Sequence, residues 1–282
     1  MQLAEAYGQD ATVEEAYPGF PAWRNVGIER WRDGQTLPAE DRVADEVPVA
    51  LVYNGISHAV MLASPVDLDM FALGFSLTEG IIRDKSDLYD LEVMPRAEGI
   101  ELQMTIAQEA FANLKERRRS MAGRTGCGLC GAENLAQVVR HPAPLGAGCK
   151  ITPVAVHRAF AQLTARQPIQ ALTGAVHAAA WADASGQVLL VQEDVGRHNA
   201  LDKLIGALAT QAVDVSHGFA IVTSRASYEM VQKTASYGIT LLAAISAPTG
   251  LAIDLARETG LTLLGFTRQD SHVIYANPQR IQ

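Results

Sequence analysis

Apolar and polar residues alternate regularly only after about residue 45. Val49–Tyr53 and His58–Ala63 are apolar runs separated by Asn54-Gly55, and both residues of that dipeptide tolerate positive φ. These features predict a β-hairpin. A helix should follow, with Ser64-Pro65 as its N-cap and first helical residue and Gly80 as its stop.

The second half of the chain alternates segments of strand and helix length. In chain order, we predict helix Pro153–Arg166, strands Val176–Trp181 and Gln187–Val191, helix Asn199–Leu208, strand Phe219–Thr223, helix Ala226–Tyr237, strand Thr240–Ile245, helix Thr249–Thr259 and strand Leu261–Phe266. Strands separated by helices of this length need crossover connections. We therefore expect an α/β sandwich with a largely parallel sheet.

Changes in composition divide the chain into three parts. Residues 1–45 are polar, acidic and rich in Pro and Gly, and they predict an extended or irregular segment. A loop is expected at His141–Gly148, which holds two prolines and two glycines. We therefore expect a smaller mixed α+β N-terminal domain at 46–150 and the α/β domain at 151–282.

The overall composition narrows the classes of function. Hydrophobic residues make up 48% of the 282 residues, and the net charge of −8 argues against broad nucleic-acid binding. The first thirty residues show no secretory signal, and no apolar run is long enough to predict a membrane span. Three cysteines do not form a disulfide framework in a chain of this size, so a reducing cytoplasm fits best.

The strongest chemical signal is the pair Cys127 and Cys130. The glycines around it are Gly123, Gly126, Gly128 and Gly131, and the basic residues upstream are Lys115, Arg117, Arg118, Arg119 and Arg124. Glycines let backbone N–H groups approach an anion, and positive charge favours the nucleophilic thiolate.

Three other interpretations of the cysteine pair compete. It could be half of a zinc site completed by Cys149 and His141, a thioredoxin-type disulfide couple, or a structural pair. The glycines disfavour the helix that a thioredoxin-type couple requires. Structural cysteines belong in apolar surroundings. The glycine-rich loop supplies two thiolates and the sequence offers no convincing second pair of ligands, so we expect no bound zinc.

Polar residues follow three of the predicted strands. The segments are Thr223-Ser224-Arg225, Ser246-Ala247-Pro248-Thr249 and Phe266-Thr267-Arg268. Ligands of open α/β sheets bind at the carboxyl ends of parallel strands, and hydroxyls with Arg at a helix start suit a phosphate. The same hydroxyls could instead be helix N-caps.

Two further polar features interrupt the apolar strands. Glu193–Asn199 contains Asp194, Arg197 and His198, and His177 lies in an otherwise apolar strand. These groups could form a capping network, an interface or part of a chemical site.

Taken together, the motifs resemble those of the formate dehydrogenase accessory sulfurtransferases, the FdhD family. The segments that carry the resemblance are Asn54-Gly55, Gly74 to Gly80, Cys127 to Gly131, Thr173 to Ala179, Glu193 to Ala200, Ser224 to Glu229, Ile245 to Thr249 and Gly265 to Arg268. They extend from about residue 45 to the end. Cys149 is not part of the family pattern.

The resemblance implies a homodimeric protein that takes sulfur from a cysteine desulfurase. It would pass that sulfur to the bis(molybdopterin guanine dinucleotide) cofactor of formate dehydrogenase. The persulfide cysteine maps onto Cys127, with Cys130 as the second catalytic cysteine, and the cofactor segment maps onto Phe266, Thr267, Arg268, Gln269, Asp270 and Ser271. The second domain is expected to have a cytidine-deaminase-like fold.

The proposed cofactor site, the exclusion of deamination and one alternative function complete what we expect from the sequence. The strand-end residues Ser224, Arg225, Ser246 and Thr249 should join the cofactor segment, with guanosine diphosphate as a mimic of the cofactor. Deamination is excluded, because His177 is followed by two alanines instead of the required His-x-Glu, and the cysteine pair precedes it. A non-catalytic chaperone, in which the cysteines only grip the metal or its sulfur ligands, is the alternative function.

Overall fold

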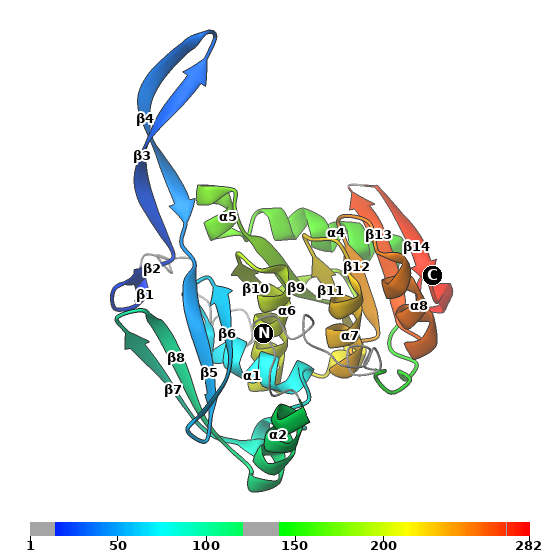
Figure 1. Ribbon diagram of the computed structural model, residues 1–282. Helices are drawn as coiled ribbons and strands as arrows, with labels where there is room; N and C mark the ends of the chain where they lie inside the picture. The colour runs from blue at the N-terminus through cyan, green and yellow to red at the C-terminus, as the bar shows by residue number, and fades with distance from the viewer. Residues whose placement is uncertain (1–14, 121–140, 269) are drawn as a thin grey trace.

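The structure is a computed structural model of the chain, and it describes residues 15–120, 141–268 and 270–282. Two α/β units lie side by side, and a long hairpin projects from them (Figure 1). No helix in these ranges is long and apolar enough to cross a membrane.

The N-terminal unit is a four-stranded sheet packed mainly against helix α1, with α2 adding Leu114 to the same core. Its elements are β5 Val47–Tyr53, β6 Ile56–Ala63, α1 Leu68–Thr78, the short 3-10 helix η1 Lys85–Asp87, β7 Leu88–Arg96, β8 Gly99–Ile106 and α2 Gln108–Ser120. The sheet order is β6-β5-β8-β7, and only β5 and β8 pair in parallel among these strands. Alternate residues of β5, such as Val49 and Leu51, are buried against Phe71 of α1.

The predicted hairpin is confirmed. β5 and β6 pair antiparallel, and Asn54 and Gly55 at the turn have φ values of 46° and 80°. The predicted start of the following helix is wrong by three residues, because Asp67 is the N-cap of α1. Ser64 is used elsewhere: its N–H donates to Asp194 Oδ2 at 3.0 Å, and its hydroxyl accepts from Val195 N at 3.0 Å.

Residues 15–44 form strands, so this part of the predicted extended or irregular segment is extended, although no strand was predicted in it. The strands are β1 Glu15–Tyr17, β2 Phe20–Pro21, β3 Trp23–Arg32 and β4 Gln35–Ala44. β3 and β4 pair along their full length around Asp33-Gly34, where both φ values are positive. We call this hairpin, residues 23–44, the arm. Asp-Gly is a strong hairpin signal that polar, proline-containing surroundings obscured.

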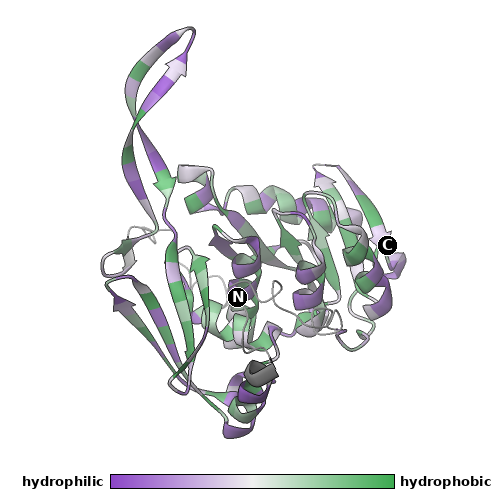
Figure 2. Cartoon of the chain, in the orientation of Figure 1, coloured by the Kyte–Doolittle hydropathy of each residue, from purple (hydrophilic) through white to green (hydrophobic). Residues whose placement is uncertain are grey.

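The C-terminal unit is a six-stranded sheet with helices on both faces (Figure 1). Its elements are α4 Pro153–Thr164, α5 Pro168–Thr173, β9 His177–Asp183, β10 Val188–Asp194, α6 Arg197–Thr210, η2 Val215–His217, β11 Gly218–Val222, α7 Tyr228–Ser236, β12 Leu241–Ala244, α8 Gly250–Thr259, β13 Thr262–Arg268, β14 Ser271–Ala276 and η3 Pro278–Arg280. Helix α4 covers one face, and α6, α7 and α8 cover the other. The strands between these layers are strongly hydrophobic, whereas the arm mixes both kinds of residue (Figure 2).

The α/β class is therefore confirmed, but the sheet is mixed where a largely parallel one was expected. The strand order is β10-β9-β11-β12-β13-β14, and parallel pairing within it is confined to β11, β12 and β13. β9 and β10 form a hairpin because four residues connect them, too few for a crossover. β14, which the sequence did not predict, returns antiparallel to β13.

The two units are joined through α1 and α6. The helices approach so closely that a Cβ on Gly74 would lie 1.7 Å from the backbone oxygen of Asp202. Two buried ion pairs lie at the same junction: Lys203 Nζ is 2.6 Å from Asp194 Oδ2, and Lys233 Nζ is 3.0 Å from Asp202 Oδ2. The packing thus fixes the N-terminal unit against the start of α6.

Candidate functional site

The carboxyl ends of β11, β12 and β13 meet at one edge of the sheet. Ile245 N donates to Val222 O at 3.0 Å, and Phe266 N donates to Ser246 O at 3.2 Å. The three polar segments predicted from the sequence are therefore neighbours. We call this the strand-end edge.

At the end of β11, Ser224 and Arg225 have different environments. Ser224 is buried, and its hydroxyl donates to the carbonyl of Arg225 at 3.0 Å. Arg225 itself is exposed. The hydroxyl therefore helps to shape the turn, while the guanidinium is open to solvent and able to meet an anion.

At the end of β12, Thr249 is a helix cap. Its hydroxyl accepts from Ala252 N at 3.3 Å, and its own N–H donates to Ala226 O at 3.0 Å. The N-cap interpretation that the sequence left open thus applies to Thr249. Ser246 is half-buried, and its carbonyl accepts from Phe266 N.

At the end of β13, a bulge turns the strand outward. The pairing with β14 shifts between Gly265 and Arg268, and Phe266 has a φ of 49°, which is strained for a bulky residue. Its ring is 42% exposed, so it does not pack in the core. Strain of this kind gathers at ligand sites.

The remaining residues of the predicted cofactor segment lie on both sides of the tip of the β13–β14 hairpin. Arg268 is exposed and pairs with Ser271, and Asp270 is exposed. Thr267 is 1% exposed, and no hydrogen-bond partner for its Oγ1 is found in the described parts of the chain. Gln269 lies outside the described residues.

On the other side of β11, Asp194 is a structural residue. It is fully buried and accepts hydrogen bonds from Ser64 N, Gly196 N and Asn199 Nδ2 at 2.7 to 3.0 Å, in addition to its ion pair with Lys203. It connects β10, the start of α6 and the N-terminal unit, which matches the capping and interface interpretations.

His177 and His198 lie at the edge itself. His177 begins β9 opposite Asp194, and burial, followed by the charges of Arg197 and His198, lowers its pKa. His198 Nε2 lies 2.7 Å from Glu229 Oε2 in the first turn of α7, and this contact is the main cause that lowers the pKa of Glu229. Glu229 was part of a family motif in the sequence but was not predicted as a site residue. The contact between α6 and α7 is what brings it beside His198.

Cys127 and Cys130 lie outside the described residues. Cys149 is described and half-buried, with its Sγ 3.8 Å from the carbonyl of Gly218 at the start of β11. That position is the opposite edge of the sheet, and burial raises the pKa of the Cys149 thiol. Cys149 is therefore poorly placed for chemistry at the strand-end edge.

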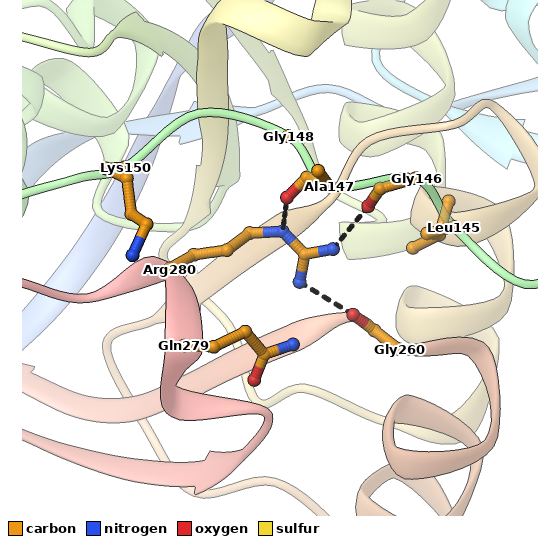
Figure 3. Close-up of a pocket in the computed structure, with 8 residues that line it drawn as sticks. All are labelled: Leu145, Gly146, Ala147, Gly148, Lys150, Gly260, Gln279 and Arg280. Carbon is orange, nitrogen blue, oxygen red and sulfur yellow. Dashed lines mark hydrogen bonds between the residues drawn. The ribbon is translucent and has the colours of Figure 1, made fainter.

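A cavity of about 430 Å³ also lies away from this edge, between residues 145–150, here called the linker, and Gly260 just before β13 (Figure 3). Arg280 lines this cavity, and its guanidinium donates to the carbonyls of Gly146, Ala147 and Gly260 at 2.6 to 2.7 Å. These bonds occupy the guanidinium in holding the linker. In the ranges that the structure covers, no group of three or more His, Cys, Asp or Glu side chains is arranged to hold a metal.

The comparisons with known proteins all indicate the same family. A sequence model of the FdhD/NarQ family matches residues 44–282. The chain is 59% identical over 282 residues to the sulfur carrier protein FdhD of Cupriavidus necator, covering 100% of this chain and 96% of that protein. It is 58% identical over 247 residues to the protein of the same name from Bordetella bronchiseptica, covering 88% and 90%.

One solved structure is similar in fold. A candidate formate dehydrogenase accessory protein from Desulfotalea psychrophila superimposes with a TM-score of 0.73 at 23% identity, covering 93% of this chain and 100% of that one.

Proposed function

The chain belongs to the FdhD/NarQ family, and on this premise we propose that it is a sulfurtransferase that carries persulfide sulfur on Cys127. The donor is a cysteine desulfurase, and the acceptor is the bis(molybdopterin guanine dinucleotide) cofactor destined for formate dehydrogenase. The protein acts as a homodimer in the cytoplasm. The observation that supports this proposal best is the 59% identity, over the whole length of this chain, to a protein named as a sulfur carrier.

The chemistry of loading follows from the thiolate. The Cys127 thiolate attacks the outer sulfur of the desulfurase persulfide, the S–S bond breaks, and its electron pair leaves with the desulfurase thiolate. The products are a persulfide on Cys127 and a free thiolate on the donor. The basic residues between Lys115 and Arg124 favour the reactive form by lowering the free energy of the anion.

Cofactor binding is assigned to the strand-end edge. Arg268 and Arg225 are exposed there, and a guanidinium presents paired donors that fit phosphate oxygens. The outward ring of Phe266 offers a flat apolar face to a guanine or a pterin. Cys130, the second cysteine of the pair, is assigned to the same transfer step as Cys127.

Mass spectrometry after incubation with a cysteine desulfurase and cysteine tests the proposal. We expect one added sulfur on the peptide that contains Cys127, and none in Cys127→Ala. Cys149→Ala is the matched control, and it should load like the unmodified chain because Cys149 lies at the opposite edge of the sheet.

Three outcomes would redirect the assignment. Sulfur confined to Cys149 would show that the wrong cysteine has been chosen. If no sulfur is added although the protein still restores formate dehydrogenase activity, the non-catalytic chaperone is correct. One zinc per chain in protein purified without chelators would favour a structural metal site instead.

A further inference from the structure

One face of the arm combines basic and apolar side chains. β3 and β4 pair without a register shift, so residues two positions apart share a face with the residues directly opposite them. The arm face, as we call this surface, carries Arg24, Ile28, Arg30 and Arg32 of β3 and Leu37 of β4. Its cations therefore all lie on one strand, and the other strand adds apolar area.

The outer part of the arm face is open to solvent. Leu37 is 56% exposed, and Arg30 and Arg32 are exposed as well. The base of the arm is held in place, because Asp45 N donates to Ala22 O at 2.9 Å. The arm therefore projects away from the sheet of its own chain (Figure 1). An isolated two-stranded hairpin is only marginally stable in water, so this face favours a partner that covers it.

The four-stranded sheet of the N-terminal unit has an open face of complementary character. Helix α1 packs on one face of this sheet, and the residues that alternate with the buried ones point away from it. Val60 and Leu62 of β6 are 56% and 54% exposed there, and Asp90 and Glu92 of β7 are also exposed. The pairing register puts these four side chains on the same face. We call this surface the outer sheet face.

The two faces carry opposite charges. The arm face holds three arginines and one acid, Asp41. The outer sheet face holds Asp90, Glu92 and Glu101, of which Glu101 is paired with Arg96 at 2.9 Å. In the arm, basic β3 lies beside β4, and in the sheet, acidic β7 and β8 lie beside the apolar outer residues of β5 and β6. One alignment can therefore join cation to acid and apolar area to apolar area.

We propose that the arm face of one copy packs on the outer sheet face of a second copy, and that this exchange is reciprocal around a twofold axis. The inference rests on the homodimer of the proposed function and identifies the surfaces that form it. Sulfur transfer itself is not part of the argument. Sheets that pack face to face in this way keep their strands within about 30° of each other.

The size of the contact suits a stable dimer. Each strand of the arm has 10 residues, which gives a ribbon roughly 30 Å long and about 10 Å wide. Two such contacts bury roughly 1,200 Å² in total, at the lower end of the range for specific protein interfaces. The charges add to this argument, because two copies with a net charge of −8 repel each other unless a basic surface meets an acidic one.

Charge reversal tests the contact, with the dissociation constant of the dimer measured by sedimentation equilibrium. The arm variant is Arg30→Glu with Arg32→Glu, and the sheet variant is Asp90→Arg with Glu92→Arg. All four residues are exposed, so both chains should stay folded. Each variant alone should weaken the dimer at least about tenfold, because like charges then face each other in both contacts. An equimolar mixture of the two variants should restore the dimer, since each contact again joins opposite charges.

Glu29→Lys with Glu40→Lys is the matched control on the opposite face of the arm, and it should dimerise like the unmodified chain. The proposal is wrong if the unmodified chain is a monomer, if the sheet variant alone dimerises as tightly as it does, or if the mixture stays monomeric. A monomer that instead sediments with vesicles of an anionic phospholipid would assign the arm face to a lipid surface. Sulfur loading on Cys127 is measured separately on the unmodified chain, so its failure counts against sulfur transfer and not against the exchange of arms.

Discussion

Single residues at the end of β13 turn a buried strand outward to the protein surface. The bulge at Phe266 exposes its ring and leaves Arg268 solvent-accessible beside Ser271. Gly265 permits this geometry, because a Cβ there would lie 2.9 Å from Pro248 Cδ and 3.0 Å from Ser246 O. The close packing of Gly265 against Ser246 and Pro248 thus helps to fix where Phe266 and Arg268 leave the sheet.

Arg268→Ala should weaken the binding of guanosine diphosphate by roughly 1.5–3 kcal/mol, because one charge-assisted contact to phosphate is lost. Isothermal titration calorimetry measures the change. Arg257→Ala removes an exposed arginine of α8 and should bind like the unmodified chain, as should Cys127→Ala. Unaltered affinity in Arg268→Ala would mean that the phosphates bind elsewhere than at the end of β13.

Lys203 and Asp194 show a different use of charge at the residue scale. Both side chains are fully buried, and Lys203 also donates to the carbonyls of Ser64 and Glu193. A buried ion pair adds little stability compared with an apolar pair, but removal of one partner leaves the other charge uncompensated.

Lys203→Met should therefore lower the free energy of unfolding by about 3–5 kcal/mol, measured by urea denaturation. Lys150→Met, at an exposed lysine, is the control and should change it little. The double variant Lys203→Met with Asp194→Asn should recover part of the loss, since neither charge of this pair remains. A single variant as stable as the control would contradict the ion-pair argument.

At the scale of elements, the contact between α1 and α6 joins the two units. Gly74 and Gly206 let the helices touch backbone to backbone, since added Cβ atoms would lie 1.7 Å from Asp202 O and 1.9 Å from Met70 O. Lys233 of α7 strengthens the same junction by donating to Thr78 and Asp202. The start of α6, and with it the strand-end edge, is positioned by this contact.

Gly74→Ala should destabilise the protein by more than about 2 kcal/mol, because two backbones must separate to admit one methyl group. Gly250→Ala is a matched helical control with open space around it, and it should be neutral or stabilise slightly by removing glycine's entropy. Thermal unfolding of both variants under the same conditions measures the difference. Equal stability of the two variants would show that the helices can separate without cost.

At the scale of the whole molecule, the arm stands apart from the packed body (Figure 1). Its base packs through Trp23 and Ala44 against a small cluster that includes Ile169 of α5. Further out, Trp31 is 70% exposed and Leu37 is 56% exposed. The outer part of the arm therefore contributes little to the core of either unit.

Replacing residues 27–40 by Asn-Gly should lower the midpoint of thermal unfolding by less than about 4 °C, corresponding to at most about 1 kcal/mol. Val26 and Asp41 pair directly, so a two-residue turn can connect them. Differential scanning calorimetry measures the midpoint. A collapse of the transition would mean that the outer arm supports the body.

Local chemistry determined much of this protein. Asn54-Gly55 specified its hairpin, and Thr152 with Pro153 specified the start of α4, because turn residues and helix caps act over a few neighbouring residues. The regular alternation after residue 150 predicted the α/β class and placed three polar segments at strand ends. The motifs also identified the family, which the family match confirms.

Tertiary packing decided what periodicity does not encode. Apolar runs predict strands without their partners in the sheet, so the pairing of the β9–β10 hairpin with β11 and the antiparallel strand β14 emerged only in the assembled sheet. Ser64 reads locally as a helix cap, yet Asp194, 130 residues away, takes its N–H. His198 and Glu229 become partners only because α6 and α7 pack side by side. Such contacts depend on which faces are buried together, and that is a property of the whole chain.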